Sequence, residues 1–309
     1  MRKRRILITG ASGLLGLNLA LEAARDYEVI GQVNRHPLNP GSFETIQTDL
    51  LAPGAVQRLL DQTQPDWVIH CAAQAVVDAC EKDPEQARQL NTEVPRLLAR
   101  DVARGGARLL HVSTDAVFDG RRGGYSENDL PNPLSVYART KLAGEQAVAE
   151  ENPQALIARV NLFGWSNSRQ RSLAEFFFNH LSAGKTCMGF TDVFFCPMLA
   201  NDLGWLMLEM LNAGLGGLYH AVGSECISKY EFGCRVARQF GFAEALVIPT
   251  SVQDSGLAAA RSPNLTLRTD RLSRALGHPL PGLSTGLERF CTLYQQGYPQ
   301  ELAQMLLKD

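Results

Sequence analysis

The stretch "RRILITGASGLLGLNLALEAA", from Arg4 to Ala24, allows two interpretations. Basic residues fill positions 2–5 and no further charge follows until Glu22, as at the start of a secretory signal peptide. The apolar part of a signal peptide avoids helix breakers and polar residues, whereas this run contains Thr9, Gly10, Ser12, Gly13, Gly16 and Asn18. It is also too broken and too short to cross a bilayer. We therefore predict a buried strand around Ile6–Ile8, a glycine turn and a helix that ends near Arg25.

The turn has the sequence "GASGLLG", Gly10 to Gly16. In a dinucleotide-binding turn, the first glycine permits a tight turn, the second lets the backbone approach a diphosphate, and the third lets the helix pack on the sheet. The helix that follows points its positive end and its N–H groups at the diphosphate. A glycine-rich turn without a ligand is the alternative, but the position between a strand and a helix favours cofactor binding.

Length, charge and cysteine content limit the class of protein. A chain of 309 residues can bury one large core, or one core with a smaller lobe. Because the net charge is −2, we expect neither nucleic acid nor a membrane as a partner. The seven cysteines are odd in number and lack CxxC spacing, which favours reduced thiols in a cytoplasmic protein over a disulfide framework, and no cluster has metal-ligand spacing. The cysteines are Cys71, Cys80, Cys187, Cys196, Cys226, Cys234 and Cys291.

Apolar runs and helical patterns alternate in the first half of the chain. The predicted strands are Arg5–Thr9, Glu28–Val33, Trp67–Ala72, Leu109–Ser113 and Leu156–Val160, and the helices include Pro84–Arg104 and Tyr137–Glu150. Such alternation predicts a parallel sheet with helices on both faces. After Gly164 we expect a helix at Leu203–Leu211, a last sheet strand at Leu218–Val222, and helices at Lys229–Phe240, Thr269–Leu276 and Thr285–Gln296.

The predicted fold is an α/β, Rossmann-type doubly wound parallel sheet with a smaller, interleaved mixed α/β lobe. Residues 1–164, with about 200–222, are expected to form the dinucleotide-binding core. Residues 165–199 and 223–309 are expected to form a substrate-binding lobe.

The residues after the second predicted strand bear on cofactor choice. NAD-selecting proteins usually place an Asp or Glu there to bind the ribose hydroxyls. This chain has Asn34, Arg35 and His36 instead, and a guanidinium suits a 2′-phosphate. We therefore expect NADP(H) to be preferred over NAD(H), although Arg35 could also be a solvated surface charge.

A tyrosine and a lysine lie four residues apart in "YARTK", Tyr137 to Lys141, and hence on one face of a helix. An ammonium group beside a phenol favours phenolate, so we expect Lys141 to lower the pKa of Tyr137. The hydroxyl of Thr114, at the end of a predicted strand, could hold a substrate carbonyl. This set suits acid–base catalysis of carbonyl reduction. The spacing also arises by chance on helix surfaces, and the glycine turn is what favours catalysis here.

Together these motifs resemble the extended short-chain dehydrogenase/reductases, and specifically their dTDP-4-dehydrorhamnose reductase branch. The resemblance rests on "GASGLLG", "HCAAQAVVDACEKDP", "STDAVFDG", "YARTKLAGE", "FFCPMLANDL" and "RSPNLTL". It implies that Tyr137 is the proton donor, that Lys141 also holds the nicotinamide ribose, and that Thr114 binds the carbonyl. The implied cofactor-binding residues are Gly10, Ser12, Gly13, Leu14, Leu15, Gly16, Asn34, Arg35, His36, Asp49, Leu50, Cys71, Ala72, Ala73, Tyr137 and Lys141.

The chain departs from that branch at the expected substrate pocket. Ala116 stands where an aromatic residue is usual, so we expect a wider pocket. Related dehydratases carry an Asp-Glu pair here, whereas this chain has Asp115 followed by Ala116, which argues against dehydration. Asp115, Ala116, Asn161 and Arg261 are the candidate substrate-binding residues. Arg261 would meet a nucleotide-sugar phosphate or lie as a charge on the rim, and Arg159 has no assigned role.

Three functions fit the resemblance. The first is an NADPH-dependent reductase of the 4-keto group of a nucleotide-linked deoxysugar, acting as a homodimer. The second is an NADP-binding partner subunit without its own turnover, since the regulatory β subunit of methionine adenosyltransferase resembles the same branch. The third is a nucleotide-sugar epimerase, which would retain tightly bound NAD.

Overall fold

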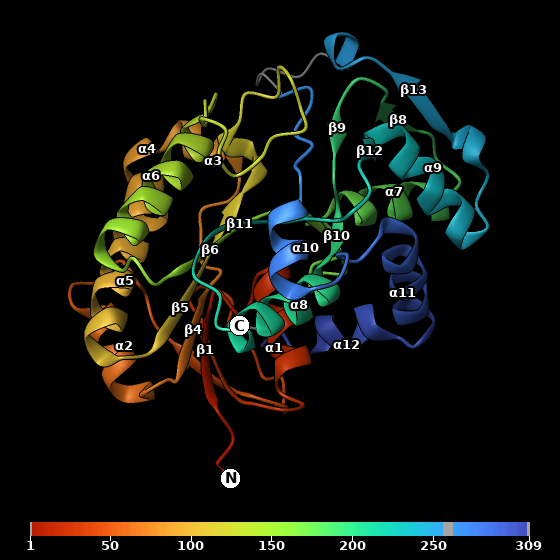
Figure 1. Ribbon diagram of the computed structural model, residues 1–309. Coiled ribbons are helices and arrows are strands. Elements are labelled where there is room, and N and C mark those ends of the chain that lie inside the picture. Colours follow the sequence, from red (N-terminus) through yellow and green to blue (C-terminus); the bar gives the residue numbers. More distant parts are fainter. Residues whose placement is uncertain (1, 256–261, 308–309) are drawn as a thin grey trace.

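A seven-stranded parallel sheet lies at the centre of the computed structural model, which describes residues 2–255 and 262–307 (Figure 1). The strand order is β11-β6-β5-β4-β1-β2-β3. The strands are β1 (Arg5–Thr9), β2 (Glu28–Val33), β3 (Glu44–Gln47), β4 (Trp67–His70), β5 (Arg108–Thr114), β6 (Leu156–Val160) and β11 (Gly217–Ala221). The order reverses between β1 and β4, and doubly wound sheets bind ligands at such a point, beyond the carboxyl ends of the strands.

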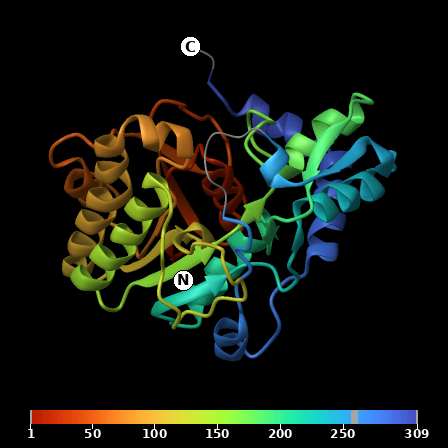
Figure 2. The same cartoon turned by 90° about the horizontal axis from the view of Figure 1, so that it is seen from above.

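Helices cover both faces of the sheet, because successive strand residues point to opposite sides. Ile6 and Ile8 of β1 pack on one side, whereas Leu7 packs on the other. One layer holds α1 (Leu14–Ala23), α8 (Ala200–Asn212) and α10 (Asp270–Leu276), and the other holds α2 (Ala55–Thr63), α5 (Val94–Gly105) and α6 (Val136–Glu151). The two layers stand on opposite sides of the sheet in Figures 1 and 2. The predicted Rossmann-type architecture is confirmed.

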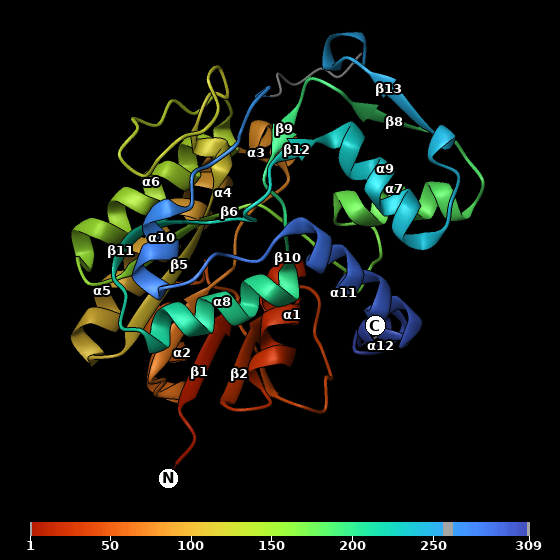
Figure 3. The same ribbon diagram turned by 45° about the vertical axis from the view of Figure 1, so that its right-hand side comes forward.

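The second lobe is smaller and lies beside the sheet (Figure 3). Its helices are α7 (Leu173–Ser182), α9 (Lys229–Phe240), α11 (Leu283–Gln295) and α12 (Tyr298–Gln304). Its short strand pairs are β8 (Cys187–Phe190) with β13 (Val247–Thr250), β9 (Phe194–Phe195) with β12 (Ile227–Ser228), and β7 (Leu162–Phe163) with β10 (Met198–Leu199). An aromatic cluster fills the lobe, with Trp165 stacked on Phe290 at 4.0 Å between ring centroids.

The elements between β4 and β5 differ from the single helix predicted at Pro84–Arg104. The structure has α3 (Val77–Lys82), α4 (Pro84–Arg88), a π-helical turn at Gln89–Glu93 and then α5. Asp83 caps α4, since its side chain accepts a hydrogen bond from the Gln86 backbone at 2.9 Å. The π turn contains Asn91, whose Nδ2 donates hydrogen bonds to the Gln74 carbonyl and to Thr140 Oγ1. Short 3-10 turns lie at Asp115–Val117, Glu244–Leu246 and Val252–Ser255.

Cys196 and Cys226 form a disulfide, so the expectation of reduced thiols is wrong for these two residues. Cys196 directly follows β9 and Cys226 directly precedes β12. The antiparallel pairing of these strands brings the two Cα atoms to 4.1 Å, although the residues are 30 apart in sequence. The other five cysteines are unbridged. Within the described residues, no helix combines the length and apolar character needed to cross a membrane.

Candidate active site

The glycine turn joins β1 to α1 at the reversal point of the sheet. Gly10 has a φ of +68°, and a Cβ placed on it would lie 2.8 Å from the Cα of Ala72. A Cβ on Gly16 would collide with the carbonyl oxygen of Gly10. Glycine is therefore required at both positions by close backbone packing. α1 begins after Gly13, and no described side chain caps its first turn, so the amides of Leu14 and Leu15 face the end of the sheet as donors for an anion.

The segment Cys71-Ala72-Ala73 is hydrogen-bonded to the end of β1 beside this turn. The backbone N–H of Cys71 donates to the Thr9 carbonyl at 3.2 Å, and that of Ala72 donates to Thr9 Oγ1 at 3.3 Å. Thr9 Oγ1 also lies 2.7 Å from Nδ1 of His70. The structure thus places the 71–73 segment next to the glycine turn.

The residues expected at the adenosine end lie together beyond β2. Asn34 Nδ2 donates to Asp49 Oδ1 at 3.4 Å, and Gln47 Nε2 donates to the Asn34 carbonyl at 2.9 Å. Asn34, Arg35 and His36 are exposed, whereas Leu50 is buried. The arrangement leaves the guanidinium of Arg35 accessible to an anionic group at the end of β2.

Thr114, Tyr137 and Lys141 come together at the carboxyl end of β5. Thr114 is the last residue of β5, and Tyr137 and Lys141 lie one turn apart in the first half of α6. Tyr137 hydrogen-bonds to Thr114. Lys141 is buried and its Nζ donates to the carbonyl of Val112 at 2.6 Å. Ser135 caps α6 by accepting from the Ala138 backbone at 3.2 Å, which fixes where the helix starts.

Burial dominates the protonation of this set. It raises the pKa of Tyr137 to about 12, while the hydrogen bond with Thr114 acts in the opposite direction. It also lowers the pKa of Lys141 to about 8, against the charge of Glu145. The prediction that Lys141 lowers the pKa of Tyr137 is wrong for this structure, because desolvation of the phenol dominates and the charge of Asp115 raises the pKa further. At neutral pH the tyrosine therefore holds its proton and the lysine is charged.

Asp115 and Asn161 meet beside Thr114. Asp115 is buried and accepts from Asn161 Nδ2 at 2.5 Å and from Thr114 Oγ1 at 3.1 Å. Burial raises the pKa of Asp115 to about 6, although these two hydrogen bonds and the charge of Lys229 oppose the shift. Ala116 follows in the same 3-10 turn and is half-buried. Arg261 lies outside the described residues.

Two side chains that sequence reasoning missed reach the glycine turn from the second lobe. Asn167 Nδ2 and Arg171 Nη1 donate to the Ser12 carbonyl at 3.2 and 3.3 Å. The buried carboxylate of Glu175 holds their loop by accepting from the backbones of Ser166 at 2.6 Å and Arg171 at 2.8 Å. The S-x-x-E capping box in the sequence could have predicted where α7 starts. It could not show that the loop before it folds onto the glycine turn.

Arg159, which had no assigned role, forms a buried ion pair with Glu145 of α6 at 2.8 Å. Among the described residues, no group of three or more His, Cys, Asp or Glu side chains could hold a metal ion.

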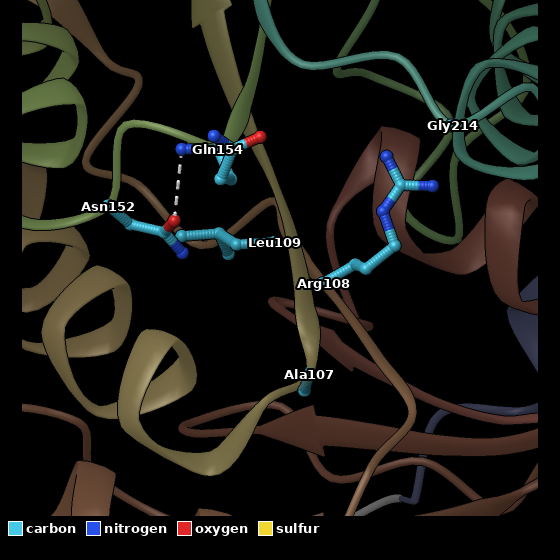
Figure 4. A pocket seen from close by; sticks show the side chains of 6 residues that line it. All are labelled: Ala107, Arg108, Leu109, Asn152, Gln154 and Gly214. Carbon is cyan, nitrogen blue, oxygen red and sulfur yellow. Dashed lines mark hydrogen bonds between the residues drawn. The ribbon is translucent and has the colours of Figure 1, made fainter.

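A cavity of about 330 Å³ lies at the other end of the sheet (Figure 4). It is lined by Ala107, Arg108, Leu109, Asn152, Gln154 and Gly214. Arg108 and Leu109 begin β5, whereas Thr114 ends it. The Arg108 guanidinium donates hydrogen bonds to the carbonyls of Leu211 and Leu215, at and just after the end of α8. This cavity is therefore separate from the candidate site.

Comparisons with known proteins agree with this geometry. The family described as RmlD substrate binding domain matches residues 4–296. The chain belongs to the RmlD substrate-binding domain family. Two relatives of this family member are the Danio rerio methionine adenosyltransferase 2 subunit beta and the Haloferax volcanii probable low-salt glycan biosynthesis reductase Agl14. The first is 33% identical over 87% of this chain and 84% of its own length, and the second is 33% identical over 91% and 95%.

Solved dTDP-4-dehydrorhamnose reductases share the fold of this RmlD-family chain. The Bacillus anthracis enzyme in complex with NADP aligns with a TM-score of 0.80 and 28% identity, covering 94% of this chain and 99% of that one. The resemblance to the dTDP-4-dehydrorhamnose reductase branch is confirmed.

Proposed function

We propose that this RmlD-family protein is an NADPH-dependent reductase of the 4-keto group of a nucleotide-linked deoxysugar. The observation that carries the proposal is the convergence of Thr114, Tyr137 and Lys141 at the end of β5, beside the glycine turn after β1. The relatives named as reductases and the solved dTDP-4-dehydrorhamnose reductases support the same reaction class.

The residues present fit a dinucleotide. The backbone around Gly10 and Gly16 has no room for a Cβ, and the first turn of α1 offers N–H groups to a diphosphate. Arg35 would receive a 2′-phosphate, which is the basis for proposing NADP(H) rather than NAD(H). Asn34, Asp49 and Leu50 would border the adenosine. When bound, NADPH supplies a hydride.

The chain's own groups would handle the carbonyl and the proton. The hydroxyl of Thr114, which donates to Asp115 in the structure, would turn toward the carbonyl oxygen and orient it together with the hydroxyl of Tyr137. Tyr137 would then release its proton to that oxygen. The proton is present at neutral pH because the pKa of Tyr137 is about 12. The charge of Lys141 would stabilise the phenolate that is left.

Asp115 and Asn161 would contact the sugar next to the reacting carbon. Their mutual hydrogen bond at 2.5 Å fixes both side chains beside Thr114. The small side chain of Ala116 leaves room for the sugar at this point. The position carries no second carboxylate that could serve as the base of a dehydration.

One observation favours a second candidate. The relatives named methionine adenosyltransferase 2 subunit beta are as similar to this chain as the reductase Agl14 is. In the second proposal, the chain binds NADP as the partner subunit of another enzyme and need not turn over a substrate.

The deciding experiment follows NADPH absorbance with dTDP-4-keto-6-deoxyhexoses, with wild type beside Tyr137→Phe. The reductase predicts turnover by the wild type and a loss of about a hundredfold or more in the variant, since the proton donor is gone. NADPH binding without turnover on any of these sugars would reject the reductase. Association with a methionine adenosyltransferase catalytic subunit would then support the second proposal.

A further inference from the structure

Glu145 is a buried carboxylate at the centre of a network directly behind the proposed catalytic groups. It lies on α6, one turn after Lys141, and is 5% exposed. Ser113 Oγ donates to its Oε1 at 2.5 Å. Arg159 donates through Nε at 3.0 Å and through Nη2 at 2.8 Å. A single side chain thus receives hydrogen bonds from two neighbouring strands.

The attachment points of this network lie next to the reacting groups. Ser113 of β5 is paired in register with Arg159 of β6. Ser113 directly precedes Thr114, and Arg159 lies two residues before Asn161, on the same face of the extended chain. Because side chains four residues apart share a helix face, Glu145 projects from the same side of α6 as Lys141. The carboxylate therefore joins the three elements that carry Thr114, Lys141 and Asn161.

Of the described titratable groups around Lys141, Glu145 is the one that carries a charge near neutral pH. The titratable groups on the packed elements are His70 of β4, Cys71 after β4, His111 of β5 and Glu145 of α6 itself. Burial lowers the pKa of His70 to about 3 and that of His111 well below its usual value, and it raises the pKa of Cys71 to about 12. Near neutral pH these three groups are uncharged. The carboxylate of Glu145 is then the counter-charge that faces the ammonium.

We propose that Glu145 is a positioning residue of the reaction: it locks α6 to β5 and β6 and keeps the Lys141 ammonium charged at its place behind Tyr137. The inference rests on the proposed reductase function for its effect on turnover, and on NADPH binding for a second readout. A purely structural ion pair would hold the helix without affecting the protonation of Lys141.

The test uses Glu145→Gln, which keeps the shape of the side chain and removes its charge. The affinity for NADPH is measured by fluorescence titration from about pH 6 to about pH 9. Lys141 is expected to hold the ribose only when charged, so wild-type affinity falls as the pH rises through the pKa of this lysine. In the variant, the midpoint of this fall moves down by about one pH unit, because an opposite charge nearby is lost and Arg159 is left uncompensated. In the turnover assay, kcat at about pH 8 falls by about fivefold, because the charged fraction of Lys141 falls with its pKa, and the loss at about pH 6 is smaller.

Two controls separate charge from structure. Glu150→Gln makes the same substitution at an exposed position of the same helix and is expected to behave as wild type. Ser113→Ala removes a hydrogen bond and keeps the carboxylate, so its midpoint stays at the wild-type pH. If Glu145→Gln does not fold, Arg159→Met takes its place: it removes the cation that partners Glu145, so the midpoint is expected to move to higher pH instead of lower.

An unchanged midpoint in the folded variant, whether Glu145→Gln or Arg159→Met, overturns the inference. Tyr137→Phe, measured in parallel, shows which hypothesis has failed. Undiminished turnover in Tyr137→Phe contradicts the reductase mechanism, whereas its loss beside a wild-type pH profile in Glu145→Gln contradicts the positioning role alone.

Discussion

The ammonium group of Lys141 lies 2.6 Å from the carbonyl oxygen of Val112, two residues before the end of β5. This hydrogen bond crosses from α6 to the sheet and sets the depth at which the lysine sits behind Tyr137. The lysine is buried, and its desolvation explains why its pKa is lowered to about 8. A charge held at this place is sensitive to pH in the range where the protein would work.

The first prediction concerns the alkaline limb of activity. Lys141 carries its charge below its pKa and loses it above, so reductase activity is expected to decline as the pH rises through about 8. Lys141→Met should abolish this limb and lower kcat by about a hundredfold at neutral pH, since the phenolate loses its partner. The pH–rate profile measures both effects. Lys185→Met, at an exposed position, is the matched control, and an equal loss in the control would contradict the assignment.

The second prediction concerns cofactor choice. If Arg35 binds the 2′-phosphate, Arg35→Ala should weaken NADPH binding by about tenfold or more and leave NADH binding nearly unchanged. Fluorescence titration with both cofactors gives the ratio. Arg35→Lys should lie between wild type and alanine, since it keeps the charge without the bidentate geometry. Equal losses for NADPH and NADH would remove Arg35 from the 2′-phosphate site.

The third prediction concerns the loop that reaches the glycine turn from the second lobe. Arg171 donates to the Ser12 carbonyl at 3.3 Å, and its other N–H groups stay available to the diphosphate that the turn would hold. Arg171→Ala should therefore weaken NADPH and NADH to a similar degree, by about tenfold, in contrast to Arg35→Ala. Arg169→Ala, an exposed neighbour in the same loop, is the control. An effect on NADPH alone would instead place Arg171 at the 2′-phosphate.

Elements with a strong local pattern could be predicted from the sequence. The strand Arg5–Thr9 and the helix Lys229–Phe240 have the predicted bounds, because apolar spacing and capping residues are local signals. β3 at Glu44–Gln47 was missed because it is a short edge strand whose residues are half-buried or exposed. The π turn before α5 depends on tertiary hydrogen bonds made by Asn91, which no local pattern reveals.

In the candidate site, too, local features could be predicted from the sequence, whereas features that depend on tertiary contacts could not. Spacing was enough to predict that Tyr137 and Lys141 share one helix, because the motif is local, and their catalytic role stays a prediction. Predicting the disulfide between Cys196 and Cys226 would have required knowing that β9 pairs with β12. The protonation of Tyr137 depends on how deeply α6 packs against β5, so burial could reverse the expected pKa shift.

The fourth prediction concerns acid stability. His111 of β5 is paired with His70 of β4, and their rings are stacked at 5.4 Å between centroids. Neither ring nitrogen of His111 has a hydrogen-bond partner among the described residues. Burial lowers its pKa well below that of an unfolded chain, about 6.5. Below that pH the unfolded chain takes up a proton that the folded protein does not. As the pH is lowered, the free energy of unfolding therefore decreases by up to about 1.4 kcal/mol per pH unit for this residue. His111→Leu should remove the share of this residue from the slope between about pH 7 and about pH 5 in urea unfolding, while the buried His70 and His220 keep theirs. Stability at about pH 7.5 should not fall, because the polar group that the substitution removes is unpartnered. His36→Leu, on the surface, should keep the wild-type slope, and an unchanged slope in His111→Leu would show that this histidine is not the source of the acid sensitivity.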